Sequence, residues 1–142
     1  MKVARWLFIL AGLAAGFAAA VPASAQEGKF SLELNNARDI NGGCRLVYIA
    51  INGTGIVLEK TSYEVVVFDT DERVTQFLIL EFGRLAVGKT KVMQFDLPEQ
   101  PCAQISRLLI NDVAECTSNG QPVTVCMDAL ETRTRTSVGF GL

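Results

Sequence analysis

From about residue 29 onward, the hydrophobic residues come in short runs that are rich in Val, Ile, Leu, Phe and Thr. Stretches rich in Gly, Asn, Asp and Pro separate these runs, namely NNARDINGG, NGTG, DTDER, GRLAVGK and LPEQP. Short apolar runs bounded by such residues are typical of β-strands joined by turns. The pattern predicts strands at 29–34, 44–51, 62–68, 74–81, 89–96, 105–113, 123–127 and 132–140.

The strand pattern predicts an all-β fold, an immunoglobulin-like antiparallel β-sandwich of about seven to eight strands. RLVYIAI and EVVVFD are almost continuously apolar, which is typical of central strands covered on both faces. ETRTRTSV instead alternates, with Arg133 and Arg135 on one face and threonines on the other. We expect an edge strand there, because arginines discourage pairing with other chains.

The segment CAQISRLLINDVAEC permits a second interpretation. Ile105, Leu109, Val113 and Cys116 also lie at helical spacing, so 103–116 could form a helix packed on the sandwich. We favour a strand because the neighbouring segments are predicted strands.

The first 25 residues have the features of a cleaved secretory signal. Lys2 and Arg5 precede the apolar run WLFILAGLAAGFAAA, and Ala23–Ser24–Ala25 supplies small residues for cleavage. The run is shorter than the roughly 20 residues that span a bilayer. We expect residues 26–142 to form a single exported domain, periplasmic or secreted, with no membrane span after cleavage.

The chain has 13 basic residues, 15 acidic residues and no histidine, and its charges are interspersed. This pattern lacks the basic footprint of a nucleic-acid-binding protein. The absence of histidine removes the usual base of serine and cysteine hydrolases. We therefore expect a protein that is not an enzyme, needs no cofactor and has no nucleic-acid partner.

The chain contains an even set of cysteines, which in an exported protein indicates disulfides. The CxxC and Cys/His spacings of redox and zinc sites are absent. Of the possible pairings we favour Cys44 with Cys102 and Cys116 with Cys126. In the chain-entropy model these bridges contribute roughly 4 and roughly 3 kcal/mol.

The segment CTSNGQPVTVC contains a turn signal that conflicts with the second bridge. A two-residue hairpin centred on Asn119 and Gly120 would pair Cys116 with Val123 rather than with Cys126. We therefore expect either this hairpin or a wider loop that allows the Cys116–Cys126 bridge.

Two clusters are candidate binding sites. Asp69, Asp71 and Glu72 of FDTDER alternate as carboxylates do in calcium loops, although the glycine and later glutamate of an EF-hand are missing. The simpler interpretation is a hairpin loop in which Asp69 caps the turn. Arg133 and Arg135 could bind an acidic partner or a lipid phosphate, or could simply be solvated.

Three stretches carry a resemblance to known proteins: CRLVYIAINGTGIVLEKTSYEVVVFDTDERV, LAVGKTKVMQFDLPEQPC and ISRLLIND. Over roughly residues 44–133 the chain resembles small exported alphaproteobacterial proteins of unassigned activity, labelled only as signal-sequence domain proteins. The order and spacing of turns and strands are also similar to those of immunoglobulin-like modules of the FxLYD type. The alphaproteobacterial label implies twin-arginine export, from which this leader departs, and it implies no functional residues.

These observations predict a non-catalytic exported protein that acts as a protein–protein interaction module of the bacterial envelope, through its loops or an edge strand. The partner would be another envelope or secreted protein. The alternative is a periplasmic protein that binds a small ligand or calcium through the loop formed by Asp69, Asp71 and Glu72.

Overall fold

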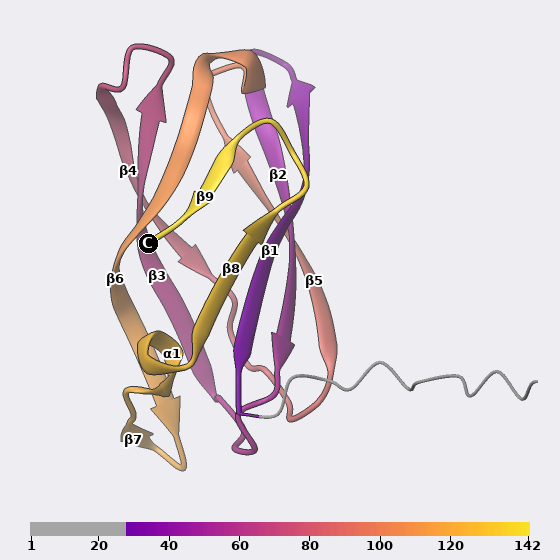
Figure 1. Ribbon diagram of the computed structural model, residues 1–142, viewed down its shortest axis with the longest axis vertical. Coiled ribbons are helices and arrows are strands. Elements are labelled where there is room, and N and C mark those ends of the chain that lie inside the picture. Colours follow the sequence, from indigo (N-terminus) through magenta and orange to yellow (C-terminus); the bar gives the residue numbers. More distant parts are fainter. Residues whose placement is uncertain (1–27) are drawn as a thin grey trace, which may run out of the picture.

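The computed structural model describes residues 28–142, so the predicted signal at 1–25 lies outside the described residues. Two β-sheets pack face to face as a sandwich, which confirms the predicted architecture (Figure 1). The first sheet has the order β5 (Thr90–Leu97), β2 (Gly43–Asn52), β1 (Phe30–Ile40), β8 (Leu130–Thr134). The second has the order β4 (Val74–Glu81), β3 (Lys60–Asp69), β6 (Ile105–Ser118), β7 (Gln121–Pro122), and β9 (Gly139–Gly141) also pairs with β6.

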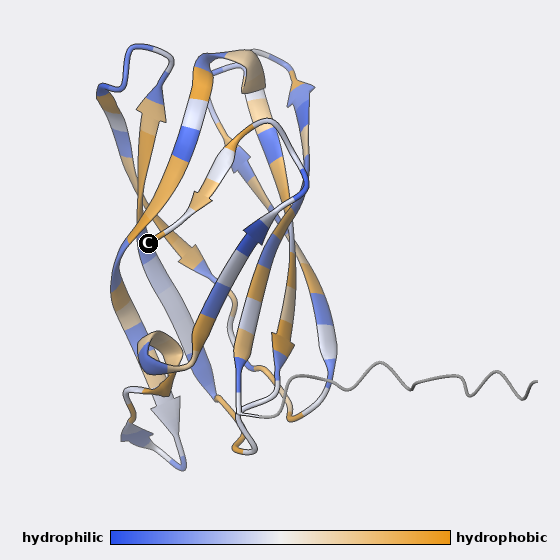
Figure 2. Ribbon diagram, in the orientation of Figure 1, coloured by the Kyte–Doolittle hydropathy of each residue, from blue (hydrophilic) through white to orange (hydrophobic). Residues whose placement is uncertain are grey.

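The strands predicted to be central are β2 and β3, and both have a partner on each side. Alternate residues of β2 point into the sandwich, so that Leu46, Tyr48 and Ala50 are fully buried. Hydrophobic residues are concentrated in the strands, whereas the loop between β3 and β4 is hydrophilic (Figure 2).

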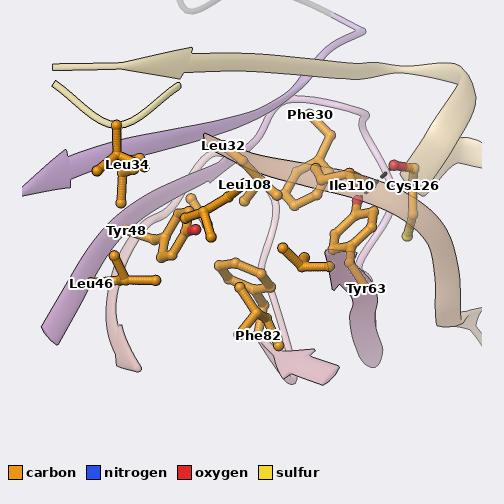
Figure 3. Packing of buried hydrophobic residues seen from close by; sticks show 14 of the residues in the cluster. Phe30, Leu32, Leu34, Leu46, Tyr48, Tyr63, Phe82, Leu108, Ile110 and Cys126 are labelled. Carbon is orange, nitrogen blue, oxygen red and sulfur yellow. Dashed lines mark hydrogen bonds between the residues drawn. The ribbon is translucent and has the colours of Figure 1, made fainter. Parts of the chain in front are cut away.

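Aromatic rings fill the space between the sheets (Figure 3). Tyr48 packs edge-to-face against Phe82, Phe95 and Phe140, with ring centroids 5.7, 5.9 and 5.1 Å away. These rings come from both sheets and from the segment after β4, so the core ties distant parts of the chain together.

Residues 105–116 lie in the long strand β6, and the alternative of a helix is wrong. β6 pairs with β3, and the register shifts at three places along the pair. At such bulges one residue is skipped, so buried positions fall three apart, as in Ile105 to Leu108. The four residues at helical spacing do not share one face of the strand, because Ile105 and Cys116 lie in the core whereas Leu109 does not.

The predicted strand at 123–127 is wrong: the short β7 ends at Pro122, and Val125–Asp128 forms one helical turn, α1. The hairpin and the bridge, expected to exclude each other, are both present. Asn119 and Gly120 have φ values of 50° and 71°, and the Val123 amide donates to the Cys116 carbonyl at 2.9 Å. α1 then turns the chain back, which brings Cys126 to Cys116.

The predicted strand at 132–140 is two strands in different sheets. β8 pairs in parallel with β1, and β9 pairs in parallel with β6, so the predicted antiparallel order does not hold for these two. Between them the Thr134 hydroxyl donates to the Val138 carbonyl at 2.9 Å, and the Val138 amide donates to the Thr136 hydroxyl at 3.0 Å. These bonds bend the chain from one sheet to the other.

Both predicted disulfides are present, Cys44–Cys102 and Cys116–Cys126. The first joins β2 to the 3₁₀ turn η1 (Cys102–Gln104), and the second joins β6 to α1. Such bridges persist in oxidising, extracytoplasmic compartments. Among residues 28–142, the structure contains no helix with the length and hydrophobicity of a membrane span.

Candidate functional site

The loop between β3 and β4 uses its first acidic residue to form the turn. The Asp69 carboxylate accepts hydrogen bonds from the backbone amides of Asp71 and Arg73, both at 2.9 Å. This is the turn-capping role predicted for Asp69. Asp69 also borders an open polar hollow of about 450 Å³ next to Gln100, whose buried amide is already bonded to Thr75 and Gln104 within the protein.

The carboxylate of Glu72 is directed to a different partner. The Arg107 Nε atom donates to it at 3.0 Å, and this hydrogen bond is the main reason that the pKa of Glu72 lies below its usual value. The Arg107 guanidinium also lies over the Phe68 ring, 3.8 Å from its centroid. In the predicted trio, Asp69 thus forms a turn, Glu72 forms an ion pair and Asp71 is exposed. Residues 28–142 contain no group of three or more possible metal ligands.

The two predicted binding arginines converge on a residue that the sequence analysis did not identify. The Arg135 Nε atom donates to a Glu33 carboxylate oxygen at 2.9 Å, and the Arg133 Nε atom lies 3.9 Å from the other. The amide of Asn35 also donates to Glu33 at 2.8 Å. Glu33 is only 8% exposed, so its ion pairs fasten β8 onto β1.

Hydrogen bonding lowers the pKa of Glu33. The bond from Asn35 is the largest cause, burial opposes it, and Arg135 adds to the lowering through both its hydrogen bond and its charge. The sequence contains no signal for this cluster because Glu33 and Arg133 face each other only through the parallel β1–β8 register.

A further contact holds the segment that leads into β8. The hydroxyl of Tyr63 donates to the Cys126 carbonyl at 2.6 Å inside the core (Figure 3). Burial raises the pKa of Tyr63, so this hydroxyl stays protonated and remains a donor. α1, which leads into β8, is therefore held by a buried hydrogen bond as well as by the disulfide.

The edge strand β4 has a different composition from β8. Its sequence VTQFLILE contains no proline and no basic residue, the usual features that protect an edge. Phe77 and Ile79 point outward and are 66% and 53% exposed, whereas Leu80 points into the core. β4 is thus an exposed apolar edge strand.

The hydrogen-bond pattern leaves backbone groups of β4 available along the outer edge. The Phe82 amide donates to the Thr61 carbonyl at 2.8 Å, which sets the phase of the β3–β4 pair. In an antiparallel pair the bonded residues alternate, so Leu78 and Leu80 bond toward β3 while Phe77 and Ile79 direct their N–H and C=O groups away from it. Those groups meet no other strand among residues 28–142.

The neighbouring strands add little to the exposed apolar surface. The register places Val66 of β3 beside Phe77, but Val66 is only 4% exposed. The exposed apolar surface of β4 therefore consists of Phe77 and Ile79. Exposed apolar residues at a free strand edge can take part in interactions.

Comparison with known proteins adds no further information: no protein-family model, curated protein or solved structure matches the chain.

Proposed function

We propose that this protein is a non-catalytic interaction module of the periplasm or the cell exterior, and that β4 binds an extended segment of a partner protein as an added strand. The observation that carries the proposal is the exposed β4 edge, with its outward backbone groups at Phe77 and Ile79. Added strands gain affinity from backbone hydrogen bonds and specificity from alternate side chains. The predicted immunoglobulin-like classification belongs to this proposal and is supported by the two facing sheets.

The charges at the two ends of β4 define the chemistry of the partner. Arg73 precedes the strand, Glu81 ends it, and the residues between them are uncharged. The complementary segment has apolar side chains at alternate positions, an acidic residue opposite Arg73 and a basic residue opposite Glu81. Such a segment would cover Phe77 and Ile79 and satisfy the outer backbone groups of β4.

A photo-crosslinking amino acid placed at residue 77 in intact cells tests the proposal. The matched control carries the same group at Val92, which is 58% exposed on β5, the edge strand of the other sheet. We expect one defined protein adduct from position 77 and none from position 92. The purified partner should then slow hydrogen exchange at the amides of Phe77 and Ile79, because strand addition bonds them.

Equal adducts from both positions, or unchanged exchange at Phe77 and Ile79, would contradict strand addition. An adduct between two copies of this chain would show that β4 pairs with a second copy rather than with another protein. That outcome would also contradict the proposal as stated.

A further inference from the structure

The loop that follows β4 encloses a second candidate site. Arg84, Leu85, Ala86, Lys89 and Lys91 line a hollow of about 190 Å³ between β4 and β5. Since a water molecule occupies roughly 30 Å³ of liquid, this hollow has room for a small polyatomic group. Its charged lining consists only of cations.

These cations differ from most others in the described part of the chain. Ion pairs with carboxylates are formed by Lys29, Arg45, Lys60, Arg107, Arg133 and Arg135. Arg84, Lys89 and Lys91 form none with any carboxylate of residues 28–142. In a chain with a formal net charge of −2, the loop therefore concentrates positive charge with which no carboxylate of residues 28–142 forms an ion pair.

The position of one cation is fixed by neutral groups. The Lys91 Nζ atom donates to the backbone carbonyls of Phe82 at 2.7 Å and Arg84 at 3.3 Å. These bonds restrict the ammonium group without cancelling its charge. An ammonium group has three donors, so one remains for a ligand.

The loop backbone is also anchored. Leu85 is buried, and its amide and carbonyl exchange hydrogen bonds of 2.8 and 3.1 Å with Leu58. The Gly88 amide donates to the Asn52 carbonyl at 2.7 Å. A site whose backbone is already ordered loses less conformational entropy on binding.

We propose that this hollow binds a phosphate-type anion. Arg84 would supply a planar guanidinium that can bind two phosphate oxygens, while Lys89 and Lys91 supply point charges. Val87 of the same loop and Ile56 of the loop after β2 are exposed, and the Asn52 amide bonds to the Ile56 carbonyl at 2.8 Å. The anion is therefore either a free phosphate or a lipid headgroup of a membrane. In the second case these apolar side chains would insert at the membrane surface. The site is separate from the outer edge of β4 and does not depend on the proposed function.

The test measures the binding of inorganic phosphate and of vesicles by the purified protein and by two variants that each lose two positive charges. The first variant is Arg84→Gln/Lys89→Gln, and the control is Lys29→Gln/Lys60→Gln, which removes two cations that are paired elsewhere. Nuclear magnetic resonance titration with phosphate, against chloride at equal ionic strength, reports on the amides near the hollow. Sedimentation with phosphatidylcholine vesicles, with or without phosphatidylglycerol, reports on lipid binding.

For a free anion we expect saturable shifts at the Gly88 amide, with no shift at Gly120 in the β6–β7 hairpin. For a lipid headgroup we expect sedimentation only with phosphatidylglycerol. In either case Arg84→Gln/Lys89→Gln weakens binding by roughly tenfold or more, because each charge-assisted bond contributes about that factor. The control variant retains binding.

Two results would overturn the proposal. One is that the unaltered protein binds neither phosphate nor anionic vesicles. The other is an equal loss of binding in both variants, which would assign the effect to net charge rather than to this hollow. Neither result bears on crosslinking from residue 77, so the two proposals fail independently.

Discussion

The two sheets end in edge strands of opposite character. β8 carries Arg133 and is followed directly by Arg135, and both side chains converge on Glu33 of the adjacent strand. β4 carries Phe77 and Ile79, which are exposed on an uncharged stretch. Because an unprotected edge is a template for another chain, the difference is the reason that the proposed strand addition is assigned to β4 and not to β8.

β8 is also connected to the rest of the molecule at more points than β4. The chain enters β8 from α1, which the Cys116–Cys126 disulfide and the hydroxyl of Tyr63 connect to β6 and β3. It leaves β8 through the Thr134 turn toward β9 in the opposite sheet. β4 is held by one neighbouring strand, by its inward side chains and by hydrogen bonds from Thr75 and Gln76 to Gln100.

Among changes at the two edges, the largest effect should come from removing the disulfide that anchors β8. In Cys116→Ala/Cys126→Ala, we expect the free energy of unfolding to fall by roughly 3 kcal/mol, the contribution of a loop of this length in the chain-entropy model. Chemical denaturation measures the loss, and hydrogen exchange locates it. The amides of β8 and α1 should exchange faster relative to those of β4, because β4 is distant in sequence from this bridge.

Cys44→Ala/Cys102→Ala is the matched control, since it removes the other bridge and leaves α1 anchored. It should lower stability without selectively loosening β8. If β4 and β8 lost protection equally in both variants, the disulfide would not account for the difference between the edges.

The sequence was sufficient for the sandwich because its central strands show their burial locally. β2 and β3 are apolar runs bounded by turn residues, and their character depends little on the rest of the chain. The sequence was insufficient to predict the C-terminal part of the fold. The split into β8 and β9 depends on the Thr134 and Thr136 hydroxyls bonding to Val138, and a periodicity of alternating residues does not reveal such bonds.

The candidate sites were predictable only in part. Asp69 was identified as a turn former because that role depends on its immediate neighbours. The partner of Arg133 and Arg135 was missed because Glu33 is about a hundred residues away, and only the fold brings it near. The exposure of Phe77 was missed for a different reason: VTQFLILE is rich in apolar residues, so its composition does not reveal that it lies at an edge.

The next effect, smaller than that of the disulfide, concerns Glu33 and pH. Its pKa lies below the ordinary value of 4.5, mainly through the hydrogen bond from Asn35 and with help from Arg135. A carboxylate with a lowered folded-state pKa adds stability above its unfolded-state pKa and loses it as pH falls through the folded-state value. We expect Glu33→Gln to remove up to about 1 kcal/mol at neutral pH and progressively less below pH 4.5, as thermal unfolding across this range would show.

Glu72→Gln is the control at the β4 end, because the pKa of Glu72 is also lowered, by Arg107. Glu72 is exposed, so solvent screens its ion pair and the pH dependence of stability should change less than in Glu33→Gln. A larger change in Glu72→Gln would mean that the ion pair near β4 stabilises the fold more than the one at β8, which would reverse the comparison of the two edges.

The smallest effect on stability should come from the β4 edge itself. Since Phe77 is 66% exposed, Phe77→Ser should change the free energy of unfolding by less than about 0.5 kcal/mol, and Val92→Ser on β5 should do the same. Denaturation midpoints of both variants test this. A loss of several times that size would show that Phe77 supports the fold. A near-zero change in both variants would mean that the folded protein does not need this large apolar side chain, as the proposed role of Phe77 in binding requires.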